Sequence, residues 1–184
     1  MLIGMRLPLI EPETADAETA DLMAAMQRTA GVTPNMVKAM ANSPATLRGY
    51  LGFIVALRDG GDLPAPVRAR IALLVAQEYG SDYCLSAHTY LGVNLTGLSA
   101  AEAARARAGE SDDPVSAAAL AFATALLRTG GDVTDDDLAA ADLADLAPGQ
   151  RVEIVAQVVL GVLCGLLTKA GRIDNDWPLV SHTD

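Results

Sequence analysis

The sequence predicts an all-α fold, a bundle of roughly eight helices. Apolar residues recur at helical spacing, helix start and stop signals follow one another at short intervals, and no stretch of useful length shows the alternation of a β-strand. About half of the 184 residues are hydrophobic but only 4% are aromatic, so we expect a core of Ala, Leu and Val. No linker or low-complexity segment divides the chain. Residues 1–184 are therefore expected to form one domain, with an N-terminal arm at 1–14.

The first third of the chain predicts an extended arm and three helices. Pro8 and Pro12 are incompatible with a regular helix in the arm. Thr33-Pro34 and Ser43-Pro44 each place a capping residue before a proline, the usual arrangement at the first helical position. The helices expected here run over about 14–29, 34–41 and 44–58.

The rest of the chain predicts further helical stretches. Ser99 and Glu102 match a capping box, and three acids after Thr134 suit the positive end of a helix dipole. The stretches expected are about 66–79, 82–94, 99–109, 114–129, one beginning at 134, and 148–170. The last is long enough to raise the question of a membrane span, but Glu153 and Lys169 flank it. We interpret it as a buried core helix or a helix at a subunit interface. The tail after it, with Trp177-Pro178, is expected to pack back on the body.

Composition excludes several classes of function. A net charge of −10 without any run of Lys and Arg argues against nucleic acid as a partner. Two cysteines 80 residues apart do not make a disulfide framework, which favours a reducing, cytoplasmic compartment. The first six residues do not read as a signal peptide. We therefore expect a small-molecule substrate and no membrane.

No cofactor or metal is expected either. The chain has no Gly-rich loop between a strand and a helix, and its acid clusters lack the spacing of a calcium loop. One Cys and one His give two ligands, whereas structural zinc needs four.

The candidate chemistry lies in the stretch from Gly80 to His88. If this stretch is helical, Cys84 and His88 stand one turn apart on one face. With Ser81 or Asp82 as the cap, Cys84 lies in the first turn, where the helix dipole favours a thiolate, and His88 can carry its proton. Taken alone, each residue also fits an ordinary role, the cysteine as a small buried hydrophobe and the histidine as a core or surface residue.

Three more residues are weaker candidates or have an ordinary structural role. Tyr83 adds a hydroxyl beside Cys84. Glu78 ends the preceding helix, either as a solvated acid or as a proton carrier that orients the imidazole. Cys164, in the most apolar helix, is expected to be a core residue.

Two stretches carry a family resemblance: Ala69-Arg70-Ile71-Ala72-Leu73-Leu74-Val75-Ala76 and Tyr83-Cys84-Leu85-Ser86-Ala87-His88-Thr89. They resemble the carboxymuconolactone decarboxylase superfamily, and within it the alkyl hydroperoxidase D-like, peroxidase-related branch. The likeness extends to Pro34-Asn35-Met36, Gly97-Leu98-Ser99 and Ile173-Asp174-Asn175-Asp176-Trp177-Pro178, and so covers nearly the whole chain. It implies an all-helical bundle that assembles as a homo-oligomer, with its active site in a helical pocket.

The resemblance also assigns roles to four positions. The cysteine that attacks a peroxide falls on Cys84 and the proton-relay histidine on His88. The resolving cysteine falls on Ser81, which cannot form a disulfide, and the relay glutamate falls on Ala69, which carries no proton. The implied activity is therefore that of a peroxiredoxin-type antioxidant oxidoreductase, weakened or altered, in which an external thiol reduces the sulfenic acid.

Two alternatives stay open. The other branch of the superfamily implies a decarboxylase-type lyase, in which His88 serves as a base on a small organic acid or lactone. An acid substrate needs a cation in the pocket, and Arg68 and Arg70 are candidates for it unless both are surface residues. The second alternative is a helical scaffold without catalysis.

Overall fold

The computed structural model describes residues 6–184, except for the side chains of residues 29 and 30. This part of the chain consists of helices joined by loops and contains no strand. The helices are α1 (Ala17–Ala30), α2 (Asn35–Met40), α3 (Pro44–Gly60), α4 (Ala65–Glu78), α5 (Asp82–Leu95), α6 (Ala100–Arg107), α7 (Pro114–Thr129), α8 (Asp135–Leu143) and α9 (Pro148–Ala170). The prediction of an all-α fold is confirmed. The expectations for residues 1–5 lie outside the described residues.

Most helices begin at the predicted capping residues. Where another residue occupies the N-cap position, the start of the helix moves with it. The Ser43 cap of α3 and the capping box of α6 are formed as expected. Helix α8 also begins with a capping box, between Thr134 and Asp137, which was not predicted from the sequence. The first helix begins three residues later than expected, because Asp16 caps it through the Thr19 amide while residues 11–15 form a turn. Pro34 has extended backbone angles and occupies the cap position of α2 itself, so that helix begins at Asn35.

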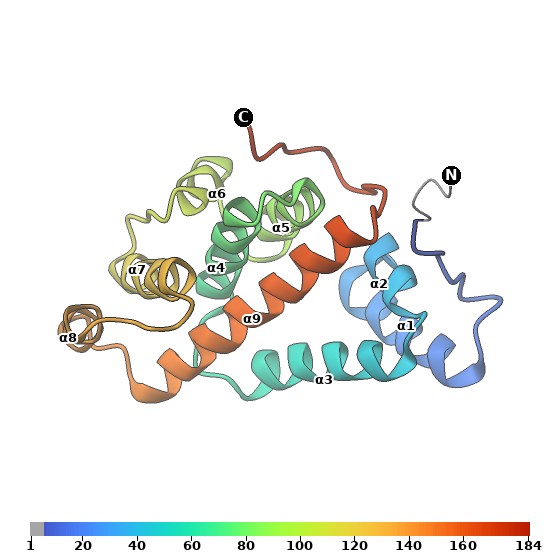
Figure 1. Cartoon of the computed structure of the whole chain (residues 1–184), viewed down its shortest axis with the longest axis horizontal. Helices are drawn as coiled ribbons and strands as arrows, with labels where there is room; N and C mark the ends of the chain where they lie inside the picture. Colours follow the sequence, from blue (N-terminus) through green and yellow to red (C-terminus); the bar gives the residue numbers. More distant parts are fainter. Residues whose placement is uncertain (1–5) are drawn as a thin grey trace.

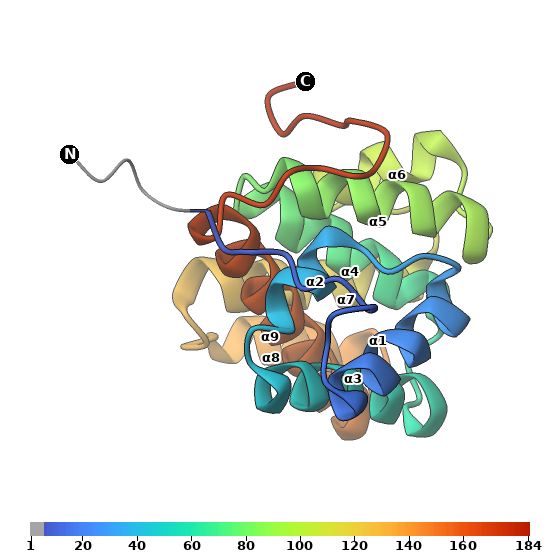
Figure 2. The ribbon, with the colours of Figure 1, turned by 90° about the vertical axis from the view of Figure 1, so that its right-hand side faces the viewer.

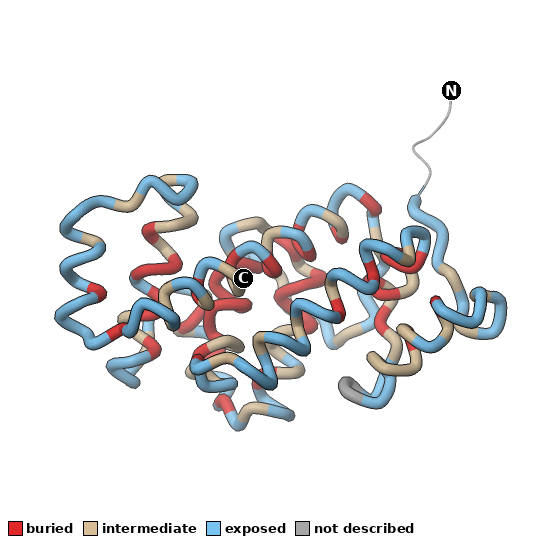
Figure 3. The backbone as a smooth tube through the Cα atoms, turned by 90° about the horizontal axis from the view of Figure 1, so that it is seen from below, coloured by how far each residue is buried: buried red, intermediate tan, exposed pale blue. Residues whose placement is uncertain are grey.

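Helix α4 is the centre of the molecule. Residues 70–76 are all buried, which is typical of a helix surrounded by other helices. It packs on α5, α6, α7 and α9, which lie around it in Figure 1. The burial colours in Figure 3 likewise place the buried residues in the middle of the bundle. Helices α1, α2 and α3 form a separate small core around Met23 and Leu47 and close one end.

Helix α9 crosses the bundle diagonally and has two different faces (Figure 1). Its inner face approaches α4 so closely that a Cβ on Gly161 would lie 2.7 Å from a Val75 methyl. Its outer face exposes the apolar side chains of Val152, Val155, Val159, Leu163 and Leu166. Among the described helices, α9 is the one that is long and apolar enough to cross a membrane by length and composition alone. The face that it buries in the bundle supports its expected role as a core helix, and the exposed stripe fits the expected alternative of a subunit interface.

The C-terminal tail packs on the body as expected. Figure 2 shows residues 172–184 running over α5, and the contacts are specific. The Ser86 hydroxyl accepts a hydrogen bond from the Val180 amide at 2.9 Å, and Asp82 accepts one from the His182 amide at 2.8 Å. Trp177 stacks obliquely on Tyr90, with ring centres 5.4 Å apart. The tail therefore forms part of the wall over α5.

Candidate functional site

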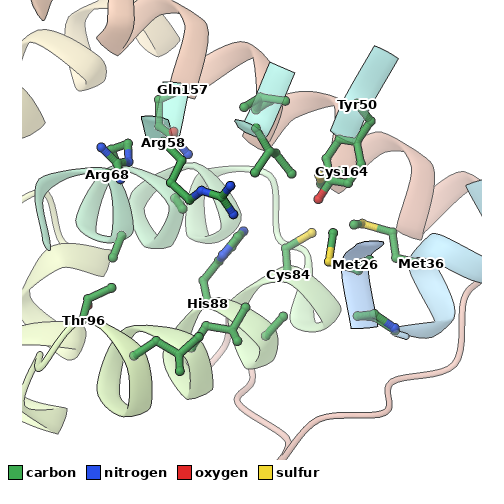
Figure 4. A pocket seen from close by; sticks show the side chains of 18 of the residues that line it. Met26, Met36, Tyr50, Arg58, Arg68, Cys84, His88, Thr96, Gln157 and Cys164 are labelled. Atoms are coloured by element: carbon green, nitrogen blue, oxygen red, sulfur yellow. The ribbon is translucent and has the colours of Figure 1, made fainter. Parts of the chain in front are cut away.

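A cavity of about 320 Å³ lies between α3, α4, α5 and α9, with contributions from α1, α2 and the tail. Most of its wall is aliphatic, from residues such as Ile54, Ala72 and Leu91. The side chains that bring a thiol, hydroxyl, amide or charge to the wall are Tyr50, Arg58, Arg68, Tyr83, Cys84, His88, Thr96, Gln157 and Cys164. Figure 4 shows most of them directed into one space. The cavity is thus apolar with a few polar groups, the usual make-up of a small-molecule site.

The start of α5 fixes where Cys84 and His88 point. Gly80 ends α4 with a φ of +56°, a left-handed conformation that glycine adopts without strain. Ser81 then caps α5, and its hydroxyl accepts a hydrogen bond from the Cys84 amide at 3.3 Å. One turn of helix separates Cys84 from His88, and both line the cavity. The structure therefore brings together the pair that the sequence singled out.

Cys84 is only 3% exposed, and its sulfur lies 3.7 Å from the Thr168 hydroxyl of α9. Burial raises the pKa of this thiol above its ordinary value, and hydrogen bonds with Ser81 and Thr168 offset part of the rise. A cysteine in the first turn of a helix was expected to favour the thiolate. The loss of hydration outweighs the helix dipole here, so the resting form at neutral pH is the thiol.

The His88 ring faces the cavity without a protein partner. Within residues 6–184 no hydrogen bond or ion pair to this ring is formed. Figure 4 shows the ring in the cavity, directed toward Arg58. Burial lowers its pKa to about 4. The imidazole is therefore neutral at pH 7, and one of its nitrogens is free to accept a proton from a bound molecule or from a thiol.

Cys164, expected to be an inert core residue, lines the same cavity from the opposite helix. It is buried, and burial followed by the nearby Cys84 raises the pKa of its thiol to about 12. The Tyr50 hydroxyl faces the Cys164 sulfur in Figure 4 and offsets part of this rise. Burial, followed by the influence of Cys164, also raises the pKa of Tyr50 itself well above its ordinary value. Both cysteines are free. The cavity therefore holds two thiols and the phenols of Tyr50 and Tyr83, all in the neutral form.

The other sequence candidates have structural or peripheral positions. The Tyr83 hydroxyl lines the cavity and accepts a hydrogen bond from the Met36 amide at 3.0 Å, which ties α2 to α5. Ser81 is buried behind Cys84, where its hydroxyl meets that of Thr168 at 2.9 Å. Glu78 is exposed and lies outside the cavity, so the structure does not bring it to Cys84 or His88.

The two arginines considered as cations have different surroundings. Arg70 is buried against Glu102 at 2.6 Å and is not part of the cavity wall. Arg68 lines the cavity; it donates to the Leu63 carbonyl, and no carboxylate in the described chain pairs with it. A third arginine, Arg58, also lines the cavity and is paired with Asp59 at 2.6 Å.

Solved structures with the same fold come from peroxidase-related proteins and a debrominase. A peroxidase-related protein from Ralstonia eutropha, with an alkylhydroperoxidase AhpD core, has a TM-score of 0.81 at 22% identity, over 93% of this chain and 92% of that one. A peroxidase-related protein from a Silicibacter species has a TM-score of 0.77 at 20% identity, over 91% and 88%. The debrominase Bmp8, as a Cys-to-Ala variant in complex with 2,3,4-tribromopyrrole, has a TM-score of 0.80 at 17% identity, over 95% and 93%. By sequence, neither a protein-family model nor a curated protein matches the chain.

The chain has the AhpD-like fold.

Within this fold, sequence reasoning found one side of the cavity and missed the other. Cys84, His88 and Tyr83 share a local motif on α5, and motifs of that kind are visible in a sequence. Tyr50 and Cys164 stand on α3 and α9, with no local pattern that marks them. The described chain contains no group of three or more His, Cys, Asp or Glu side chains placed to hold a metal.

Proposed function

We propose that this protein is a thiol-dependent reductase of the peroxidase type, in which Cys84 reduces the hydroperoxide of a small apolar molecule bound in the cavity. The observation that carries the proposal is that the Cys84 thiol and a neutral, unpartnered His88 share one cavity with a mostly aliphatic wall. A wall of this kind favours an organic hydroperoxide over hydrogen peroxide, since burying apolar surface supplies binding energy. The tribromopyrrole complex of Bmp8 supports a small apolar ring as a type of ligand that this fold accommodates.

The reaction begins from the protonated thiol. His88 accepts the Cys84 proton, and the thiolate attacks the terminal oxygen of the hydroperoxide. The O–O bond breaks, the alcohol leaves with the proton that His88 returns, and Cys84 becomes a sulfenic acid. Two equivalents of an external thiol then restore Cys84 and yield water and a disulfide of that thiol. The protein thus supplies the nucleophile, the proton carrier and the binding surface.

Turnover of cumene hydroperoxide in the presence of a small dithiol tests this function. Cys84→Ser is expected to abolish turnover, and His88→Gln to lower kcat by roughly 100-fold or more, since a positioned general base contributes about that much. Cumene hydroperoxide should have a higher kcat/KM than hydrogen peroxide. Arg70→Gln, outside the cavity, is the matched control with unchanged KM. If Cys84→Ser turns over at the wild-type rate, Cys84 is not the nucleophile.

A second function is favoured by Arg68. Its guanidinium lies in the cavity wall without a carboxylate partner in the described chain, so a small organic acid or lactone would meet a cation there and a neutral base in His88. A decarboxylase-type proton transfer would then depend on His88 and not on Cys84. In a screen of small acids and lactones, His88→Ala should abolish such turnover, Arg68→Gln should raise KM, and Cys84→Ala should change neither constant. Loss of turnover in Cys84→Ala would count against it.

We also propose a cytoplasmic homo-oligomer. The support is the exposed apolar stripe on α9, which includes Val159 and Leu166, and the two free cysteines, which suit a reducing compartment.

A further inference from the structure

We propose that Cys164 is the resolving thiol of the cavity and forms a disulfide with Cys84 during each catalytic cycle. This inference rests on the proposed peroxidase function and adds the fate of the oxidised cysteine. The resemblance places the resolving position at Ser81, three residues before Cys84 on the same helix. The structure supplies a thiol from the facing helix instead.

The two cysteines belong to one buried cluster where α5 packs on α9. The Thr168 hydroxyl lies 3.7 Å from the Cys84 sulfur and donates a hydrogen bond to the Cys164 carbonyl at 2.9 Å. Ser81 contacts the same hydroxyl at 2.9 Å, which holds the start of α5 against α9. Cys84 and Cys164 both line the cavity, and Figure 4 draws their sulfur atoms at the same end of it. A disulfide here would join two helices that already pack on each other.

The surroundings of the two thiols set the order in which they react. Burial raises the pKa of both, but Cys84 also receives hydrogen bonds from Ser81 and Thr168 that favour its thiolate, while Cys164 is held as a thiol with a pKa of about 12. Cys84 is therefore the thiol that attacks peroxide. Cys164 remains reduced until a sulfenic acid forms beside it.

The resolving step balances without a further oxidant. The Cys164 sulfur attacks the sulfur of the Cys84 sulfenic acid, the S–O bond breaks, and the departing hydroxide combines with the Cys164 proton to give water. The product is the neutral Cys84–Cys164 disulfide. An external thiol reduces it by exchange, first as a mixed disulfide and then with a second equivalent, which returns both cysteines to thiols.

The step also removes an unfavourable species from the cavity. A sulfenic acid that persists reacts with more peroxide and becomes a sulfinic acid, which is irreversible for most proteins. A second thiol within the same enclosed space captures it before that reaction. We thus assign Cys164 a catalytic role, whereas its apolar surroundings in the sequence indicated a core residue.

The first experiment treats reduced, desalted protein with one molar equivalent of cumene hydroperoxide in the presence of dimedone. The intact mass of wild type is expected to fall by two hydrogens, and both free thiols are expected to disappear. Wild type should form no dimedone adduct. Cys164→Ser and Cys164→Ala are expected to keep a sulfenic acid on Cys84 and to gain a dimedone adduct there. Circular dichroism of both variants reports their folding, and peptide mapping locates the bond. A wild-type protein that gains the same Cys84 adduct, without a disulfide, overturns the role of Cys164.

The second experiment separates this inference from the proposed function. Diamide oxidises two neighbouring thiols to a disulfide without any peroxide. Formation of the Cys84–Cys164 bond by diamide, with no response to peroxide, would refute the peroxidase function and keep the thiol pair. If peroxide forms a sulfenic acid on Cys84 but diamide forms no Cys84–Cys164 disulfide, the peroxidase function is kept and the role of Cys164 is refuted.

Discussion

The depressed pKa of His88 gives a stability prediction that can be worked out numerically. Burial lowers the pKa of this imidazole from 6.5 to about 4, so the unfolded chain binds a proton at this site at a pH where the folded chain does not. Stability is therefore lost as the pH falls from about 6.5 towards about 4. One pKa unit corresponds to about 1.4 kcal/mol, so acidification from about pH 7 to about pH 5 should lower the free energy of unfolding through His88 by about 2 kcal/mol.

Urea denaturation of wild type and His88→Gln at both pH values, at one protein concentration, measures this difference. The carboxylates titrate in both proteins, so the comparison isolates the imidazole. Wild type should lose about 2 kcal/mol more than His88→Gln between the two conditions. An NMR titration of the His88 ring checks the pKa directly, with His182→Gln used to assign the signal. Equal losses in the two proteins, or a His88 ring that titrates near 6.5, would refute the reasoning.

Three further perturbations test the packing, the assembly and the cavity wall. Gly161→Ala should lower the free energy of unfolding by about 1–3 kcal/mol, because its Cβ would overlap Val75. Gly52→Ala, where a Cβ meets no other atom, should be neutral or stabilising by up to about 1 kcal/mol. Urea denaturation of the two variants measures the difference. Val159 is 54% exposed on the apolar stripe of α9, and Val159→Asp should reduce the mass in solution measured by light scattering. An unchanged oligomer would place the interface elsewhere. Trp177→Ala should speed iodoacetamide labelling of the cavity thiols, since it opens the wall that the tail provides; an unchanged rate would show that reagents enter by another route.

The sequence could predict the features that depend on neighbours along the chain. Helix type followed from spacing, and the Ser43 and Ser99 caps followed from a residue and the amide three positions later. The start of α1 was misplaced because Thr14 and Asp16 are both good capping residues, and the turn through Glu11 decides between them.

The candidate site could be predicted only on one helix. The α5 motif is local, so Cys84 and His88 were found together. Cys164 lies 80 residues further along the chain. It lines the cavity beside Cys84 only because α5 packs on α9 through Thr168, and this packing is not visible in the sequence. The charge state also depends on tertiary structure. The helix dipole is a local effect that favours the thiolate, whereas the desolvation that opposes it comes from four helices together.

The tail over α5 affects how fast molecules can enter and leave the cavity. Residues 172–184 form no helix. Hydrogen bonds to residues such as Ser86, Asp82 and Asn35 hold them on the body, together with the apolar side chains of Ile173, Trp177 and Val180. A segment attached in this way detaches at a far lower free-energy cost than a core helix, and it does so while the rest of the fold stays intact. Because Trp177 belongs to this segment and lines the cavity, we expect opening of the tail to admit solvent to the cavity. We therefore expect the residence times of bound molecules to depend on the tail as well as on the walls that α4 and α9 provide.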